Sequence, residues 1–93
     1  MASLDLSNND IFANVQDEGP APVLAEALKK CTSLHTLVIS SNYMKAIHAK
    51  ILAPAIQDMG ALSKLDISRN RIPDSQQAEL RRICSAKSID CQL

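Results

Sequence analysis

Residues 34–44, LHTLVISSNYM, recur at residues 62–72 as LSKLDISRNRI, an offset of 28 positions. The coinciding positions hold aliphatic residues and one asparagine: Leu34, Leu37, Ile39, Asn42 and Met44 match Leu62, Leu65, Ile67, Asn70 and Ile72. The chain begins with a shortened copy of the same pattern, which runs from Leu4 to Ile11. Three units in register indicate a tandem repeat rather than chance.

Each unit changes its hydrophobic period halfway along. The first part alternates, as in Leu37-Val38-Ile39, and alternation predicts a short strand. The second part places apolar residues three and four apart, which is one face of a helix. These residues are Leu24, Ala27 and Leu28, then Leu52, Ala55 and Ile56, then Leu80 and Ile83. A strand followed by a helix can bury both apolar faces only by stacking on the next unit, so the sequence predicts an α/β protein.

The chain is short enough for one domain, since domains commonly reach about 100–150 residues. We expect a single domain over residues 1–93, with units at approximately 1–33, 34–61 and 62–88. Alternating apolar residues after position 88 predict a terminal edge strand at 89–93. The first unit is longer by five residues, which all lie between Asn9 and Leu24.

Local signals refine the expected helices. Pro54 predicts a break or kink near Ala53, because proline removes a helical hydrogen bond and clashes with the preceding turn. Gly60 is expected to end the second helix in a left-handed conformation. Asp74, with Gln77 three residues later, is typical of a capping box before the third.

The two strand motifs resemble the leucine-rich-repeat signature, and a 28-residue unit with a full helix is similar to its ribonuclease-inhibitor-like subclass. The resemblance implies a right-handed β-α solenoid, with a short parallel sheet on the concave side and helices on the convex side. It also implies that Asn9, Asn42 and Asn70 form a ladder that bonds to the backbone of each turn. Buried turns need such partners for their N–H and C=O groups.

Proteins of this family bind other proteins on the concave strand face and its loops, so the resemblance implies a non-enzymatic binding module. Strand side chains alternate between the two faces, and the repeat stacks those of successive units in rows. One row is Asp5, Val38 and Asp66, and another, past the strands, is Asp10, Tyr43 and Arg71. The residues expected to bind a partner are Asp5, Asn8, Thr36, Val38, Ser41, Tyr43, Lys64, Asp66, Arg69 and Arg71. Any exposed sheet carries polar residues, however, and valine also favours strands by shape alone.

The longer first unit supplies a second candidate surface. Residues 12–22 contain the acidic stretch QDEGP at 16–20, and insertions in repeat proteins usually emerge as loops on one face. The alternative is a tolerated surface loop without a partner.

Other classes of function find little support in the sequence. No unit combines a nucleophile, a base and an orienting acid, and His35 and His48 complete no metal pattern with the cysteines. We therefore expect no enzymatic activity, no cofactor and no metal. The formal net charge is +0, which argues against nucleic-acid and membrane-surface partners. Odd, widely spaced cysteines fit a reducing compartment, either the cytoplasm or the nucleus.

The charge distribution leaves an assembly role open. Residues 1–28 carry five acidic and no basic side chains, whereas residues 29–93 carry all ten basic ones. An acidic and a basic end favour head-to-tail contact, and uncapped repeat ends invite association. The alternatives to a binding module are thus end-to-end self-association or a piece of a longer repeat protein.

Overall fold

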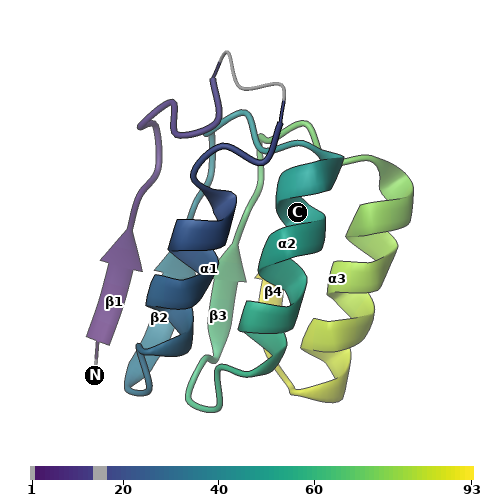
Figure 1. The fold of residues 1–93 in the computed structure, drawn as a ribbon. Helices are drawn as coiled ribbons and strands as arrows, with labels where there is room; N and C mark the ends of the chain where they lie inside the picture. The colour runs from purple at the N-terminus through teal and green to yellow at the C-terminus, as the bar shows by residue number, and fades with distance from the viewer. Residues whose placement is uncertain (1, 14–16) are drawn as a thin grey trace.

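The computed structural model describes residues 2–13 and 17–93, and these form an α/β protein in which strands and helices alternate along the chain. The elements are β1 (Ala2–Asp5), α1 (Ala21–Lys29), β2 (Leu34–Val38), α2 (Ala46–Gln57), β3 (Lys64–Asp66), α3 (Asp74–Ala86) and β4 (Asp90–Gln92). The strands form one layer and the helices a second layer over one side of it (Figure 1).

The four strands form one parallel sheet in the order β1-β2-β3-β4. Asp5 pairs with Val38, Val38 with Asp66, and Asp66 with Gln92. This register confirms the predicted row of Asp5, Val38 and Asp66, and β4 confirms the terminal edge strand. Because the strands are parallel, the loops that follow β1, β2 and β3 all emerge at one edge of the sheet (Figure 1).

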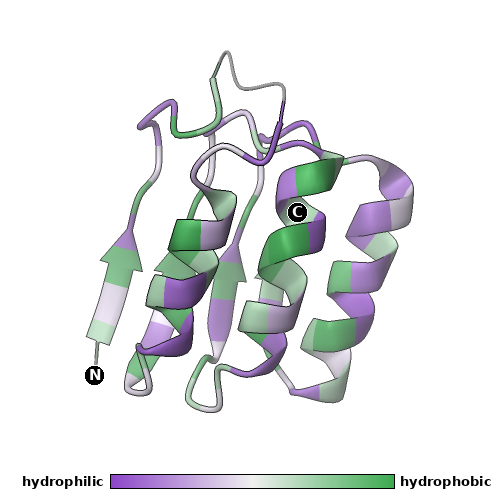
Figure 2. Cartoon of the chain, viewed as in Figure 1, coloured by the Kyte–Doolittle hydropathy of each residue, from purple (hydrophilic) through white to green (hydrophobic). Residues whose placement is uncertain are grey.

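The core lies between the sheet and the helices. Leu37 and Leu65 are fully buried on the helix side of their strands, whereas their neighbours Val38 and Asp66 are only half-buried on the other side. Figure 2 shows the resulting mixture of hydrophobic and hydrophilic residues along each element. The buried helix residues are Ala21, Ala25, Leu28, His48, Ala49, Leu52, Ala53, Ala55, Ile56, Leu80, Ile83 and Cys84.

The buried faces of α2 and α3 confirm the predicted helical spacing, but the face of α1 was assigned partly wrongly. Ala27 is exposed, and Leu24 is only half-buried. The buried residues of α1 are Ala21, Ala25 and Leu28, and Leu24 also packs against the core. Since α1 begins at Ala21, its first turn contributes a buried alanine.

The predicted break near Ala53 is wrong, because α2 continues through Pro54 to Gln57; the alternative, a kink there, stays a prediction. A proline at position 54 deprives the carbonyl of Lys50 of its helical donor. Both residues are exposed, so water can replace that bond. Ala53, Ala55 and Ile56 stay buried around the proline, and their packing holds the helix together.

The two predicted helix-end signals are also wrong. Asp58, in a right-handed conformation, closes α2 by donating its N–H to the carbonyls of Pro54 and Ala55, both at 3.1 Å. Gly60 is therefore not needed as a left-handed stop, and among the described glycines only Gly19 has a positive φ.

At the start of α3 the residue that caps the helix is Pro73, not Asp74, and no side chain bonds to the first turn. The amide of Gln77 instead donates to the carbonyl of Ile72 at 3.0 Å. Proline cannot donate a hydrogen bond, and its fixed φ suits the residue before a helix.

The asparagines form the expected ladder between neighbouring loops. The side-chain oxygen of Asn42 accepts the N–H groups of Asn9 and Ile11 at 2.9 and 3.2 Å. Its amide donates to the carbonyls of Leu6 and Ser40 at 2.7 and 3.1 Å. Asn70 repeats this one loop further along, accepting the N–H groups of Asn42 and Met44. The ladder thus fixes the three loops at one edge of the sheet.

Candidate functional site

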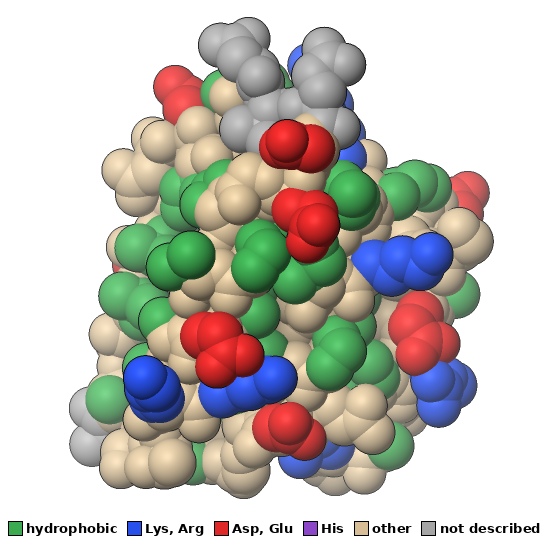
Figure 3. Space-filling view, in the orientation of Figure 1, with side chains coloured by type: hydrophobic (Ala, Val, Ile, Leu, Met, Phe, Trp, Pro, Cys, Tyr) green, Lys and Arg blue, Asp and Glu red, His purple; other side chains and the backbone are tan. Residues whose placement is uncertain are grey.

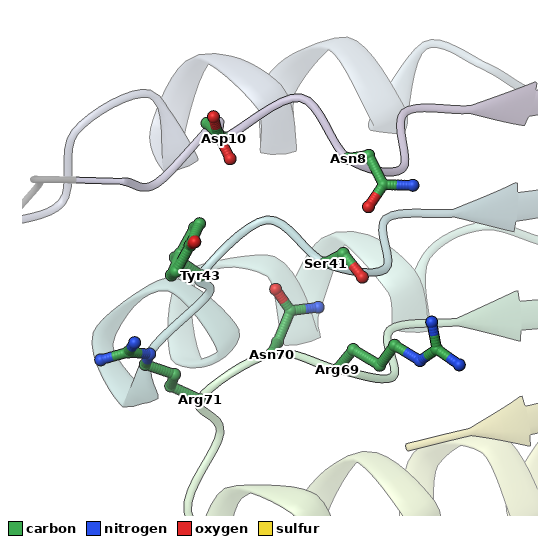
Figure 4. A pocket seen from close by; sticks show the side chains of 7 residues that line it. All are labelled: Asn8, Asp10, Ser41, Tyr43, Arg69, Asn70 and Arg71. Atoms are coloured by element: carbon green, nitrogen blue, oxygen red, sulfur yellow. The ribbon is translucent and has the colours of Figure 1, made fainter.

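The loops that follow β1, β2 and β3 surround an open hollow of about 470 Å³ at the carboxyl edge of the sheet. Each loop contributes side chains, as Figure 4 shows. They are Asn8 and Asp10 from the first, Ser41 and Tyr43 from the second, and Arg69, Asn70 and Arg71 from the third. Ligand sites commonly enclose about 300–1,000 Å³, so the hollow has room for several side chains of a partner.

The structure divides the predicted partner-binding residues into two groups. Asn8, Ser41, Tyr43, Arg69 and Arg71 come together around the hollow. The others lie on the strands, on the side of the sheet that faces away from the helices, which we call the strand face. These are Asp5, Thr36, Val38, Lys64 and Asp66.

Sequence reasoning missed four residues of these surfaces. Asp10 and Asn70 also line the hollow. The sequence signal for Asp10 was the row that it shares with Tyr43 and Arg71. Asn70 was assigned only to the asparagine ladder. On β4, Asp90 pairs with Lys64, and Gln92 pairs with Asp66. The register of the predicted edge strand would have added both to the strand face.

The hollow owes its shape to left-handed residues at equivalent places in the loops. Asn8, Ser41 and Arg69 have φ of 58°, 58° and 57°. Two positions further on, Asp10 and Tyr43 have φ of 52° and 62°. Asparagine and aspartate adopt this conformation readily, whereas bulkier side chains pay about 1–2 kcal/mol for it. The chain therefore keeps an arginine and a tyrosine here at a conformational cost.

Tyr43 and Arg71 contact one another in the hollow. The guanidinium carbon of Arg71 lies 5.2 Å from the centre of the Tyr43 ring, which is a cation–π distance. The tyrosine is 42% exposed. The pair presents an aromatic surface and a positive charge to solvent at the same point.

The two aspartates of the strand face each hold a turn. Asp5 Oδ1 accepts the backbone N–H of Ser7 at 2.9 Å and its hydroxyl at 2.6 Å. Asp66 does the same with Ser68, at 3.0 and 2.6 Å. The hydroxyl bond from Ser7 is the main cause that lowers the pKa of Asp5. One oxygen of each carboxylate therefore accepts the hydrogen bonds that hold the turn.

Residues 12–22, the second candidate surface, are not all loop, because Ala21 and Pro22 belong to α1, and some of the described residues are buried. Phe12 is fully buried and stacks on His48 with 4.2 Å between ring centres, which corrects its assignment to a surface loop. The expected acidic stretch at 16–20 is described only from Asp17 on, because residues 14–16 lie outside the described part. Asp17 and Glu18 are exposed.

His48 ties this loop to the start of α2. Its Nδ1 accepts the backbone N–H of Lys45 at 3.0 Å, so Nδ1 carries no proton. Its Nε2 therefore carries the proton and donates it to the Asp17 carbonyl at 2.8 Å. Burial is the main cause that lowers the pKa of His48, although the Asp17 contacts oppose it. The folded chain thus holds this histidine neutral.

We predict that His48 makes stability depend on pH. The unfolded chain takes up a proton at an ordinary pKa near 6.5, before the folded chain does. The stabilisation is therefore complete above about pH 6.5 and is lost as the pH falls further, with a slope of at most about 1.4 kcal/mol per pH unit. Urea unfolding between pH 7.5 and 5.5 measures it. His48→Gln should flatten the profile and His35→Gln should not; an unchanged slope in His48→Gln would refute this role.

The three cysteines are free. Cys84 is buried, and Cys31 and Cys91 are half-buried. Burial, aided by the neighbouring Cys84, raises the pKa of the Cys91 thiol to about 12. A thiol with that pKa stays protonated near neutral pH and is a poor nucleophile.

No group of His, Cys, Asp and Glu side chains within residues 2–13 and 17–93 has an arrangement that could hold a metal ion. In the same part of the chain, every helix is too short or too polar to cross a bilayer. The helix-covered side carries hydrophobic side chains interspersed with charges of both signs (Figure 3).

No protein-family model matches this chain, and no curated protein sequence matches it either. Function must therefore be argued from the site itself.

Proposed function

We propose that this chain is a leucine-rich-repeat solenoid of the ribonuclease-inhibitor-like type, a non-enzymatic module that binds a protein partner. The partner would contact the strand face, as the concave side, and the hollow beside it. Support for the fold family comes from the 28-residue sequence period, the sequential order of the parallel strands and the asparagine ladder. Free thiols support a cytoplasmic or nuclear location.

The observation that carries the binding proposal is the composition of the hollow. Two loops far apart in the sequence bring Tyr43, from the loop after β2, and Arg69 and Arg71, from the loop after β3, to its lining. Tyrosine and arginine are enriched among the residues that dominate binding energy at protein interfaces. The hollow also adjoins the sheet edge, so one partner could cover both surfaces.

The test is a matched pair of valine substitutions. Val38 lies on the strand face between Asp5 and Asp66, whereas Val23 is 74% exposed on α1. We expect Val38→Arg to abolish capture of the proteins that the immobilised chain retains from a cell extract. Val23→Arg, with the same added charge, should retain them.

Circular dichroism and thermal unfolding must show that both variants fold. Equal retention by the two variants would refute the strand face as the binding surface. Unfolding of the Val38→Arg chain would show that Val38 is structural instead.

A second candidate is assembly by stacking. In the described residues β1 and β4 each pair along one edge only. At the β1 end, exposed Val23 lies in a mainly apolar hollow with Pro22 and Ala27. Another β-α unit placed there would bury both the strand edge and this apolar surface.

Stacking predicts that the solution mass rises with protein concentration and falls with added salt, because salt screens the attraction between the acidic and basic ends. Light scattering over a concentration and salt series measures this. A monomer at every concentration would eliminate the assembly proposal and leave the binding proposal unaffected.

A further inference from the structure

The hollow carries a negative charge on one wall and positive charges on another. Asp10 lies on the wall from the loop after β1, and Arg69 and Arg71 lie on the wall from the loop after β3. Tyr43 lies between them, and Figure 4 shows its ring beside the Arg71 guanidinium while the Arg69 side chain extends toward the strands. A partner that fits this hollow must place negative charge against the β3 loop.

The two arginines have no acidic partner in the part of the chain that the structure describes. The salt bridges there join Lys29 to Glu26 and Arg82 to Glu79. Arg69 and Arg71 are both exposed. Their guanidinium groups are therefore available to an external carboxylate.

Tyr43 orients Arg71, and the N–H donors of the arginine remain available to a ligand. The N–H donors of a guanidinium lie in its own plane, and that planar fork matches the two oxygens of a carboxylate. The Tyr43 ring thus limits the rotamers of Arg71 while leaving those donors accessible. This preorganisation lowers the entropy lost on binding.

Arg69 has a left-handed backbone conformation, which a long side chain such as arginine rarely adopts. The equivalent residues of the other two loops, Asn8 and Ser41, have short side chains in the same left-handed conformation. Residues held in costly conformations concentrate at functional sites. An exposed arginine at such a position suggests a binding use for its charge.

We propose that the hollow binds an extended segment of a protein partner that carries an acidic side chain. Arg71 receives the carboxylate beside Tyr43, and Arg69 supplies a second positive charge at the end of the hollow nearer the strands (Figure 4). A neighbouring side chain of the segment packs on Tyr43. A polyanion such as a nucleic acid fits less well, because Asp10 in the hollow and Asp66 on the adjoining strand would repel its further charges. The inference rests on the proposed binding function and specifies its ligand.

The experiment selects binders from an unbiased library of acetylated and amidated peptides on the immobilised 93-residue chain. Affinities of the selected peptides are then measured by fluorescence anisotropy, together with versions in which Glu and Asp become Gln and Asn. The proteins are the wild type, Arg69→Gln/Arg71→Gln, and the charge-matched control Arg81→Gln/Arg82→Gln on α3. We expect the selected peptides to be acidic. Their affinity should fall about tenfold or more in the Gln/Asn versions of the peptide and also in the Arg69→Gln/Arg71→Gln protein, because each change removes charge-assisted hydrogen bonds. The α3 control should bind like the wild type.

Arg69→Asn separates binding from folding. Asparagine suits the left-handed conformation and is already present at the equivalent position, Asn8. This variant should be at least as stable as the wild type in thermal unfolding and should still bind acidic peptides more weakly. A variant that binds and unfolds like the wild type would contradict the role of Arg69.

The inference would be overturned by equal binding of the selected acidic peptides and their Gln/Asn versions. Equal weakening of binding in the α3 control would also overturn it. Neutral binders that depend on Tyr43 would refute the acidic ligand while leaving the hollow as a binding site. Absence of any peptide binder would also refute it, whereas Val38-dependent capture independently decides the proposed function.

Discussion

The Asn42→Ala chain should be less stable than the wild type by about 2–6 kcal/mol, a large part of the roughly 5–15 kcal/mol typical of a domain. Asn42 is fully buried, and its side-chain oxygen is the acceptor for the N–H groups of Asn9 and Ile11. Both hydrogen bonds are part-buried, and each donor that loses its acceptor there costs up to about 3 kcal/mol. The two carbonyls that accept hydrogen bonds from the Asn42 amide are not left without a donor. The Ser40 carbonyl also accepts from the N–H of Asn8, and the Leu6 carbonyl also accepts from the Asn9 side-chain amide.

The matched control for this prediction is Asn9→Ala, at the exposed end of the same ladder. The Asn9 side chain donates one bond, to the carbonyl of Leu6 at 2.9 Å. Its loss should cost less than about 1.5 kcal/mol, because that carbonyl keeps the bond from Asn42. Urea unfolding followed by circular dichroism measures both variants. Similar losses for the two would show that the ladder is not a main source of stability.

Leu37→Ala should lower the free energy of unfolding by about 2–5 kcal/mol, the usual cost of removing a buried leucine side chain. Leu37 is fully buried between β1 and β3, where it pairs with Leu4 and Leu65. Truncation leaves a cavity in the layer between sheet and helices, and regular strands on both sides limit its collapse. Urea unfolding midpoints with unchanged m-values would attribute the loss to the folded state.

Val38→Ala is the control for that substitution, because it is the next residue of the same strand and lies on the opposite face. Val38 is half-buried, and its truncation should cost less than about 1.5 kcal/mol, mostly through reduced strand propensity. A loss as large as that of Leu37→Ala would mean that the strand face is covered, which would contradict its use as a free binding surface.

The sequence period was sufficient to predict the strands and their register, whereas the ladder was expected from the family resemblance. Leu37 and Leu65 are buried, and Asp5, Val38 and Asp66 align, because side chains alternate on a strand and a fixed offset brings equivalent positions together. The period also brought Tyr43 and Arg71 within reach of one another. The loops at the sheet edge follow the same offset as the strands that precede them.

Local signals outside the period were less reliable. Pro54 and Gly60 carry strong local preferences, yet α2 continues through the first and ends before the second. Burial of Ala53, Ala55 and Ile56 outweighs the one hydrogen bond that proline removes. Packing of an apolar face contributes more to a helix than the preference of a single residue.

The sequence by itself determined the α/β class, the order of elements and the buried positions of the strands, because these depend on spacings within and between units. Only the tertiary structure decided that Phe12 leaves the surface to stack on His48, and that Asp10 and Asn70 complete the hollow. Those contacts join residues from different loops, and only the row that Asp10 shares with Tyr43 and Arg71 indicates any of them in the sequence. In the hollow they depend on the left-handed residues of each loop, which set the directions of the side chains.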